Sequence, residues 1–253
     1  EQNINNIFRQ FYSSLYSAGT EPTQSEIDSF LNNLDLPSLT TDQANYLDQP
    51  ISSEELTKAL HSMPNNKSQG PDGLSAEYYK HFWDLFAPLF LRLITDIKTT
   101  STIPTHMNTA VITLVLKPNK DPTHPSSYRP LSLMNTDLKI ITKTLASRIE
   151  TVIPSLIHPD QTGFIKNRHA SDNIRRLFNF ISIVQKQQQK TIILSLDAEK
   201  AFDKVNWSFL FTTLRKFGFG ESLIHWIRTL YTSPKATIAT NGINAGTSFT
   251  LHQ

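Results

Sequence analysis

The sequence predicts an α+β fold in which long helices surround a few strands that lie far apart along the chain. Apolar residues recur at helical spacing over much of the 253 residues, as they do on the buried side of amphipathic helices. The runs of apolar and β-branched residues are short and widely separated. They do not alternate regularly with helices, which argues against a doubly wound parallel sheet.

The expected elements follow from periodicity and from residues that start or stop helices. Ser52 and Glu55 have the spacing of a capping box, Pro88 is expected to kink a long helix, and Asn206 and Gly218 mark the two ends of another helix. Helices are expected over 4–17, 52–63, 75–98, 136–153, 171–186, 207–217 and 221–231, with a short one near 24–34, and strands over 109–118, 192–196 and a hairpin-like pair at 235–242 and 248–253.

Composition and charge narrow the class of protein. The chain is 38% hydrophobic and 18% charged, and it contains no cysteine, so neither a disulfide nor a thiolate metal site is expected. No apolar run approaches the roughly 18 residues of a membrane span, so no membrane partner is expected. Residues 1–60 carry 2 Lys and Arg against 9 Asp and Glu, whereas residues 61–253 carry 22 against 13. This asymmetry indicates either a main body that binds a polyanion or ordinary variation across a solvated surface.

The stretch "IILSLDAEKAFDKVNW" (192–207) carries a predicted buried strand directly into a cluster of charge. Asp197 at the end of that strand is either a rigidly placed ligand for a hard cation such as Mg²⁺ or the first residue of a turn. Phe202 lies five residues later and is either a core residue or part of the same site. Asp203 is either a further ligand or a turn residue.

Basic residues form two further candidate sites. Lys117 ends one predicted strand and Arg129 follows a proline-rich loop, so the pair either binds a triphosphate or is solvated surface. Lys166, Arg168 and Arg175 lie closer together in the sequence, beside Phe164. This group either contacts a phosphate backbone or forms an ordinary charged surface. The Walker A loop, the dinucleotide fingerprint, H-E-x-x-H and G-x-S-x-G are all absent from the sequence.

Five segments together resemble one family in order over residues 51–253. They are "NNKSQGPDGLSAEYYK", "VITLVLKPNKD", "SSYRPLSLMNTDLKIITKTLASRI", "DQTGFIKNRHASDNI" and "ILSLDAEKAFDKVNW". The sequence resembles the reverse transcriptases of LINE-type (non-LTR) retrotransposons. The resemblance implies a right-hand polymerase-like fold: an acidic helical extension or linker over 1–50, fingers over 51–190 and the start of a palm over 191–253, incomplete at its end.

The resemblance also implies an activity and its residues. The activity is RNA-templated DNA synthesis from a DNA primer and deoxynucleoside triphosphates, with two Mg²⁺ ions roughly 4 Å apart in the complete enzyme. Asp197 and the backbone carbonyl of Ala198 would bind metal, and Phe202 would be the steric gate against ribonucleotides. Lys117 and Arg129 would contact the triphosphate, and Lys166, Arg168 and Arg175 the template. Nuclear and cytoplasmic localisation, as a ribonucleoprotein, is implied by the family alone.

The sequence departs from the family pattern in one respect, because the motif with the paired catalytic carboxylates is missing. Since the chain does not begin with Met and stops within a strand-like pattern, we expect it to be an excerpt that is inactive alone. An alternative of another class is a non-catalytic nucleic-acid-binding remnant of a decayed element. A group II intron-like maturase fits "KSQGPDG" and "DAEKAFDKV" less well.

Overall fold

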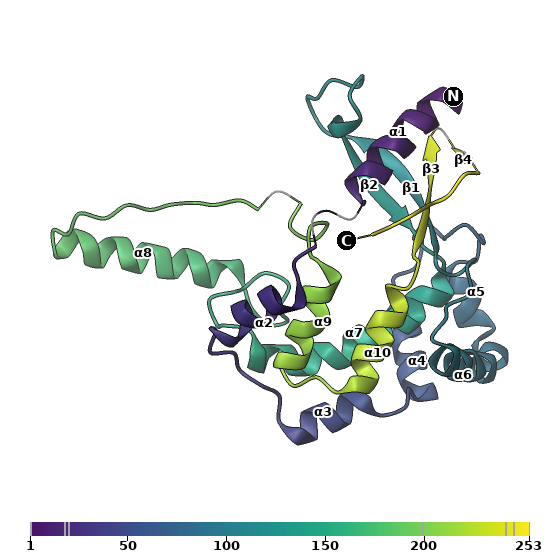
Figure 1. Cartoon of the computed structure of the whole chain (residues 1–253), viewed down its shortest axis with the longest axis horizontal. Helices are drawn as coiled ribbons and strands as arrows, with labels where there is room; N and C mark the ends of the chain where they lie inside the picture. Colours follow the sequence, from purple (N-terminus) through teal and green to yellow (C-terminus); the bar gives the residue numbers. More distant parts are fainter. Residues whose placement is uncertain are drawn as a thin grey trace.

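The computed structural model describes residues 2–17, 19, 21–198, 200–240, 242–244 and 246–252. It confirms the predicted α+β class, with helices predominating over one small sheet (Figure 1). The helices described are α1 (Gln2–Leu15), α2 (Gln24–Asn32), α3 (Thr41–Asp48), α4 (Ser53–His61), α5 (Ala76–His81), α6 (Trp83–Thr100), α7 (Thr136–Leu156), α8 (Ala170–Lys186), α9 (Trp207–Lys216) and α10 (Glu221–Leu230).

The strands are β1 (Thr109–Leu116), β2 (Tyr128–Leu133), β3 (Lys235–Thr240), β4 (Ile243–Asn244) and β5 (Phe249–Thr250), and they form a single sheet. The order is β2-β1-β3-β4, with β5 also paired to β3. β1 and β3 run parallel, although Ile112 and its partner Ile238 are far apart in the sequence. β2 was not expected, and it begins in the last residues of the proline-rich segment 119–130. It tolerates Pro130 because a residue that cannot donate a backbone hydrogen bond is accommodated on an edge strand.

Helix α1 packs against the sheet and closes a small core (Figure 1). Phe8 and Tyr12 are buried there against Ile112, Ile238 and Phe249. The acidic N-terminal segment therefore begins with a helix that packs on strands from the middle and the end of the sequence.

A larger core lies among the remaining helices and supports the candidate site. Leu56 and Leu60 of α4 pack there with Leu138, Ile141 and Leu145 of α7. α10 and α6 contribute further buried side chains, among them Ile224, Trp226, Phe90, Ile94 and Ile97. Helix α7 is therefore held along one side and presents its opposite side to solvent.

Most of the predicted helix boundaries are confirmed. Ser52 and Glu55 form the capping box of α4, and Asn206 accepts a hydrogen bond from the backbone N–H of Phe209 at the start of α9. The helix predicted over 75–98 is instead two helices that meet at Phe82, where φ is −107° and ψ is 21°. Pro88 lies within α6, six residues beyond this break.

The strand predicted over 192–196 is wrong. This stretch has no regular secondary structure, and Ile192, Leu194 and Leu196 are 92%, 75% and 84% exposed. A strand requires a neighbour for its backbone hydrogen bonds, and the described strands that pair with one another do not include this stretch. α8 and the chain that follows it project away from the rest of the molecule (Figure 1), and α8 has no buried side chain.

Among the helices that the structure describes, none combines the length and the apolar character required to span a membrane.

Candidate nucleotide site and nucleic-acid interface

Lys117 and Arg129, the pair considered for triphosphate binding, line the same cavity. Val115 pairs with Arg129 across β1 and β2, and the backbone N–H of Lys117 donates to the carbonyl of Ser127 at 2.8 Å. The Lys117 ammonium donates to the carbonyl of Ser126, also at 2.8 Å. The cavity encloses about 200 Å³. Its basic rim makes it suitable for an anion of phosphate size.

Two other parts of the chain complete this cavity, and sequence reasoning missed the part from α1 and the contribution of Lys200. Helix α1 supplies Phe11 and Tyr12, while the segment after Asp197 supplies Lys200 and Asp203. The Lys200 ammonium lies 6.0 Å from the centre of the Phe11 ring, and the backbone of Lys200 has a φ of 53°. Left-handed backbone at a residue other than glycine is uncommon and is enriched at functional sites. The sequence signal available was the position of Lys200, three residues after Asp197.

The hydroxyl of Tyr12 is buried and has no hydrogen-bond partner among the described residues. Burial, followed by the nearby Tyr16 and Asp203, raises the pKa of Tyr12 to about 12. The phenol therefore keeps its proton at neutral pH. It is a neutral side chain in a wall that otherwise carries three cations and one carboxylate.

Asp197 and Ala198 are exposed, and Asp197 is not among the residues that line this cavity. No group of three or more acidic or histidine side chains able to hold a metal ion occurs in the described part of the chain. Asp197 thus offers one carboxylate, and these residues do not fit a divalent cation by themselves. Glu199 lies outside the described residues.

Phe202 is 77% exposed and packs edge to face against Phe164. The ring centres are 5.6 Å apart and the planes meet at 89°. This contact connects the segment that carries Asp197 to the basic loop before α8. The expectation of a core residue is not met, because only one aromatic neighbour covers the ring among the described residues.

The three predicted template contacts have different surroundings. Arg168 donates hydrogen bonds to the backbone carbonyls of Pro154, Ile157, His158 and Gln161, at 2.7–3.2 Å. It therefore holds the loop against the end of α7, and much of its donor capacity is used within the protein. The Lys166 ammonium lies 3.6 Å from a carboxylate oxygen of Glu150. Arg175 is exposed on α8.

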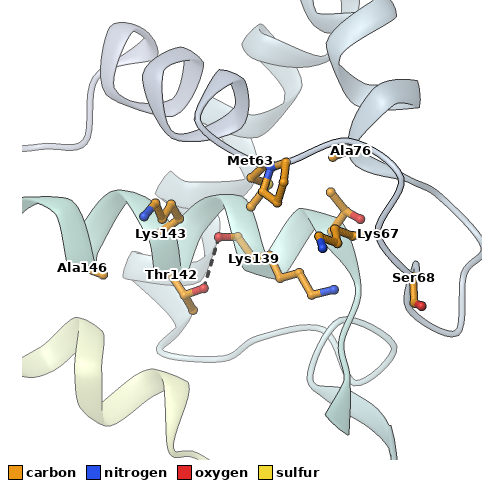
Figure 2. A pocket seen from close by; sticks show the side chains of 10 residues that line it. Met63, Lys67, Ser68, Ala76, Lys139, Thr142, Lys143 and Ala146 are labelled. Atoms are coloured by element: carbon orange, nitrogen blue, oxygen red, sulfur yellow. Dashed lines mark hydrogen bonds between the residues drawn. The ribbon is translucent and has the colours of Figure 1, made fainter. Parts of the chain in front are cut away.

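A cavity of about 510 Å³ lies between α7, the end of α4 and the loop before α5 (Figure 2). Three lysines, Lys67, Lys139 and Lys143, stand around it, and Met63 and Ala146 form part of its apolar lining. None of the three lysines was singled out from the sequence. Their proximity depends on the packing of a loop against a helix some 70 residues away.

The loop beside this cavity is anchored to the start of α7. The Oδ1 atom of Asn135 accepts a hydrogen bond from the backbone N–H of Asp72 at 3.3 Å, and the hydroxyl of Thr136 donates to the carbonyl of Leu74 at 2.7 Å. Gly70 lies so close that a Cβ atom there would be 2.3 Å from the Oδ1 atom of Asn135. Gly70, the first glycine in "KSQGPDG", is therefore required for this close approach.

Comparison with known protein families identifies the family to which the chain belongs. Residues 115–251 match the family described as reverse transcriptase (RNA-dependent DNA polymerase). The matched range covers more than half of the sequence and includes Lys117, Arg129 and Asp197. The chain belongs to this family of enzymes, whose members generally use divalent metal ions.

The relatives of the chain come from transposable elements. An uncharacterized 149 kDa protein of transposon TX1 from Xenopus laevis is 33% identical over 92% of this chain and 18% of its own length. A probable RNA-directed DNA polymerase from transposon BS of Drosophila melanogaster is 29% identical, over 66% of this chain and 19% of its own. The RNA-directed DNA polymerase from mobile element jockey of Drosophila funebris is 24% identical, over 79% and 22%. The chain spans about a fifth of the length of these relatives.

Proposed function

We propose that the chain is part of an RNA-directed DNA polymerase of a LINE-type (non-LTR) retrotransposon and binds the incoming deoxynucleoside triphosphate. The observation that carries the proposal is the meeting of Lys117 and Arg129 in one cavity, within the range that matches the family. The relatives named as RNA-directed DNA polymerases of mobile elements support it.

The reaction is the attack of a primer 3′-hydroxyl on the α-phosphate of the nucleotide, with pyrophosphate as the leaving group. Arg129 would bind phosphate oxygens through its planar donors, and Lys117 would supply a compact charge beside them. Binding the phosphate chain at fixed positions orients the α-phosphorus for attack, which lowers the entropic part of the barrier. Lys200 lines the same cavity and joins them in this proposal.

We propose Asp197, with the carbonyl of Ala198, as one part of the ligand set for Mg²⁺. When bound, two such ions stabilise the attacking and leaving oxygens in nucleotidyl transfer. One carboxylate cannot hold two cations against their mutual repulsion. The proposal therefore applies to a protein that supplies further carboxylates. No catalytic step at the metal is assigned to the residues described here. The proposal also includes an RNA template and a DNA primer. In it, Lys166, Arg168 and Arg175 contact the template, and Phe202 is the steric gate against ribonucleotides.

Nucleotide binding to the chain tests the proposal without requiring catalysis. In a fluorescence titration with a labelled deoxynucleoside triphosphate, Lys117→Gln with Arg129→Gln should weaken binding at least tenfold, with inorganic pyrophosphate as a competitor. Lys120→Gln is the matched control, because Lys120 is exposed in the same loop and is not among the residues that line the cavity. Equal affinity in the double variant and the control would refute the nucleotide site.

A second candidate function is nucleic-acid binding without catalysis. One observation favours it: Asp197 is a single carboxylate, and the described residues include no group of three or more side chains that could hold a metal ion. Translation of the genomic sequence downstream of residue 253 separates the two functions. An open frame with an Ala-Asp-Asp motif within roughly 100 residues supports the polymerase, and a stop codon or frameshift supports the remnant.

A further inference from the structure

Tyr12 is the polar residue that α1 contributes to the wall of the cavity shared by Lys117 and Arg129. It is 1% exposed, and its hydroxyl has no hydrogen-bond partner among the described residues. A buried hydroxyl without a partner destabilises a folded protein, so such groups are rare and each requires an explanation. Tyr12 also lies outside residues 115–251, the range that matches the reverse transcriptase family. The family match therefore assigns it no role.

The ring of Tyr12 is fixed by its neighbours. It packs in the small core with Phe8 and Ile112. It also stacks on Tyr16 of the next helical turn, with the ring centres 6.2 Å apart and the planes at 19°. The hydroxyl oxygen is therefore held in one place, although its hydrogen can still rotate toward an acceptor. A donor that is already in position loses little conformational entropy when a ligand binds.

Helix α1 itself is anchored to the sheet at both of its ends (Figure 1). The Oδ1 atom of Asn5 accepts a hydrogen bond of 2.7 Å from the hydroxyl of Thr240 on β3. The carbonyl of Tyr16, just beyond the other end of α1, accepts one of 2.8 Å from the backbone N–H of His252. These two bonds keep the helix, and with it Tyr12, against the cavity.

The phenol of Tyr12 lies near the carboxylate that lines the cavity. Burial is the largest cause that raises the pKa of Tyr12, and Tyr16 and Asp203 follow. An electrostatic effect of Asp203 on the phenol requires the two groups to be close, and Asp203 lines the cavity. Because the phenol stays protonated at neutral pH, it can act there as a hydrogen-bond donor.

The cavity has positive charge that the protein leaves uncompensated. Lys117, Arg129 and Lys200 line it together with one carboxylate, Asp203. In the described part of the chain, none of these three cations forms an ion pair. Hydrogen bonds to an ionised acceptor are stronger than those between neutral groups. A neutral donor such as a phenol adds one of them without repelling the cations.

The size of the cavity indicates which part of a nucleotide it can hold. Its volume of about 200 Å³ is below the roughly 300–1,000 Å³ of sites that enclose a whole small molecule. The cavity therefore takes one part of a nucleotide, and its basic lining favours the phosphates over the sugar and the base.

We propose that Tyr12 is a phosphate-binding residue, whose hydroxyl donates a hydrogen bond to a phosphate oxygen of the bound nucleotide. The inference rests on the proposed function for the identity of the ligand. The neighbouring Phe11 gives α1 a second role in the same site, because the Lys200 ammonium lies 6.0 Å from the centre of its ring. The N-terminal helix thus belongs to the nucleotide site.

Tyr12→Phe tests the contact, because it removes the hydroxyl and keeps the ring. In a titration of the chain with a labelled deoxynucleoside triphosphate, it should weaken binding about tenfold, at the lower end of what a hydrogen bond to a charged group contributes. The dependence of the affinity on salt should stay that of the parent protein, since no charge is lost. Tyr16→Phe is the matched control, because Tyr16 is on the same side of the helix and is not among the residues that line the cavity. Equal affinities in the two variants would overturn the proposal.

Thermal unfolding without nucleotide separates a binding role from a structural one. Removal of a hydroxyl that has no partner should leave the melting temperature of Tyr12→Phe equal to that of the parent protein or raise it. A lower melting temperature would show that the hydroxyl has a partner within the protein, such as Asp203, and would overturn the proposal.

Inorganic pyrophosphate tests whether the contact is made to the phosphates. Tyr12→Phe should weaken competition by pyrophosphate by the same factor as it weakens binding of the nucleotide. Unchanged competition by pyrophosphate, together with weaker nucleotide binding, would assign the hydroxyl to the sugar or the base and refute the phosphate contact.

The Tyr12 contact and the proposed function fail separately. If Lys117→Gln with Arg129→Gln loses nucleotide binding while Tyr12→Phe keeps it, the nucleotide site stands and the Tyr12 contact is refuted. If Tyr12→Phe weakens the binding of pyrophosphate and the double variant does not, the Tyr12 contact stands and the roles of Lys117 and Arg129 are refuted.

Discussion

Arg148 on α7 holds the carboxylate of Glu55 on α4 through two hydrogen bonds, of 2.6 Å from Nε to Oε1 and 2.7 Å from Nη2 to Oε2. Its remaining donors reach the backbone carbonyls of Leu47, Gln49 and Pro50. The guanidinium is 4% exposed and thereby ties α7 to the chain between α3 and α4. It is therefore a structural cation.

Replacement of Arg148 by Met should destabilise the fold strongly. Loss of the buried Arg148 leaves the partly exposed carboxylate of Glu55 and several backbone carbonyls without a donor, which costs up to roughly 3–5 kcal/mol, the range for a broken buried pair. Urea unfolding, with Arg92→Met as the control on the exposed side of α6, measures the difference. A loss below about 1 kcal/mol, the value typical of surface pairs, would show that the pair contributes little.

Stability should depend on pH through the same pair. The hydrogen bonds from Arg148 are the largest cause that lowers the pKa of Glu55 below its ordinary value of 4.5. A carboxyl with a lowered folded-state pKa contributes stability above the unfolded pKa and loses it as the pH falls through the folded pKa. We therefore expect the free energy of unfolding to fall below about pH 4.5, and Glu55→Gln to reduce that dependence. A Glu55→Gln profile that parallels the parent protein from pH 6 to 3 would contradict this role.

Gly70→Ala should loosen the loop beside the cavity of Figure 2. The new Cβ atom would overlap Asn135, so the loop must move, at a cost typical of overpacking, roughly 1–3 kcal/mol. Gly163→Ala is the control, since a Cβ atom there meets nothing within 4 Å. Thermal unfolding of the two variants measures the difference, and equal melting temperatures would show that the loop adapts without cost.

The chain alone should not extend a primer. In the described part of the chain, no group of three or more side chains could hold a metal ion. The single carboxylate of Asp197 cannot hold two cations. Primer extension on an RNA template with Mg²⁺ and deoxynucleotides should give no product above the background of an Asp197→Asn variant. Product that Asp197→Asn abolishes would mean that the chain has a complete site.

Phe202→Ala in the polymerase of full length should admit ribonucleotides. An aromatic ring five residues after Asp197 would occupy the space that a ribose 2′-hydroxyl requires. Single-turnover incorporation of dATP and ATP measures the selectivity, with Phe202→Tyr as the control that keeps the ring. Unchanged discrimination in Phe202→Ala would refute the gate.

Sequence patterns predicted the features that depend on neighbours along the chain. The caps of α4 and α9 and the run of β1 follow from local residue order. The strand over 192–196 was wrong because its composition fits a strand while no described strand pairs with it.

Features that join distant segments could not be predicted from such patterns. Arg168 resembles a surface cation in the sequence, yet it binds backbone carbonyls that only the folded loop brings together. The cavity of Figure 2 likewise depends on a loop near residue 67 meeting a helix near residue 140. Tyr12 lines the cavity shared by Lys117 and Arg129 because α1 packs on the sheet.

The parallel pairing of Ile112 with Ile238 has a consequence for synthesis of the protein. The ribosome adds roughly 5–20 residues each second, so the partner of Ile112 emerges roughly 6–25 s after it. During that interval the apolar side of α1 and the inner edge of β1 have no β3 to cover them. A nascent chain is therefore exposed to aggregation and proteolysis for longer than its helices alone require, and a chaperone that shields Phe8 and Ile112 would raise the yield of folded protein.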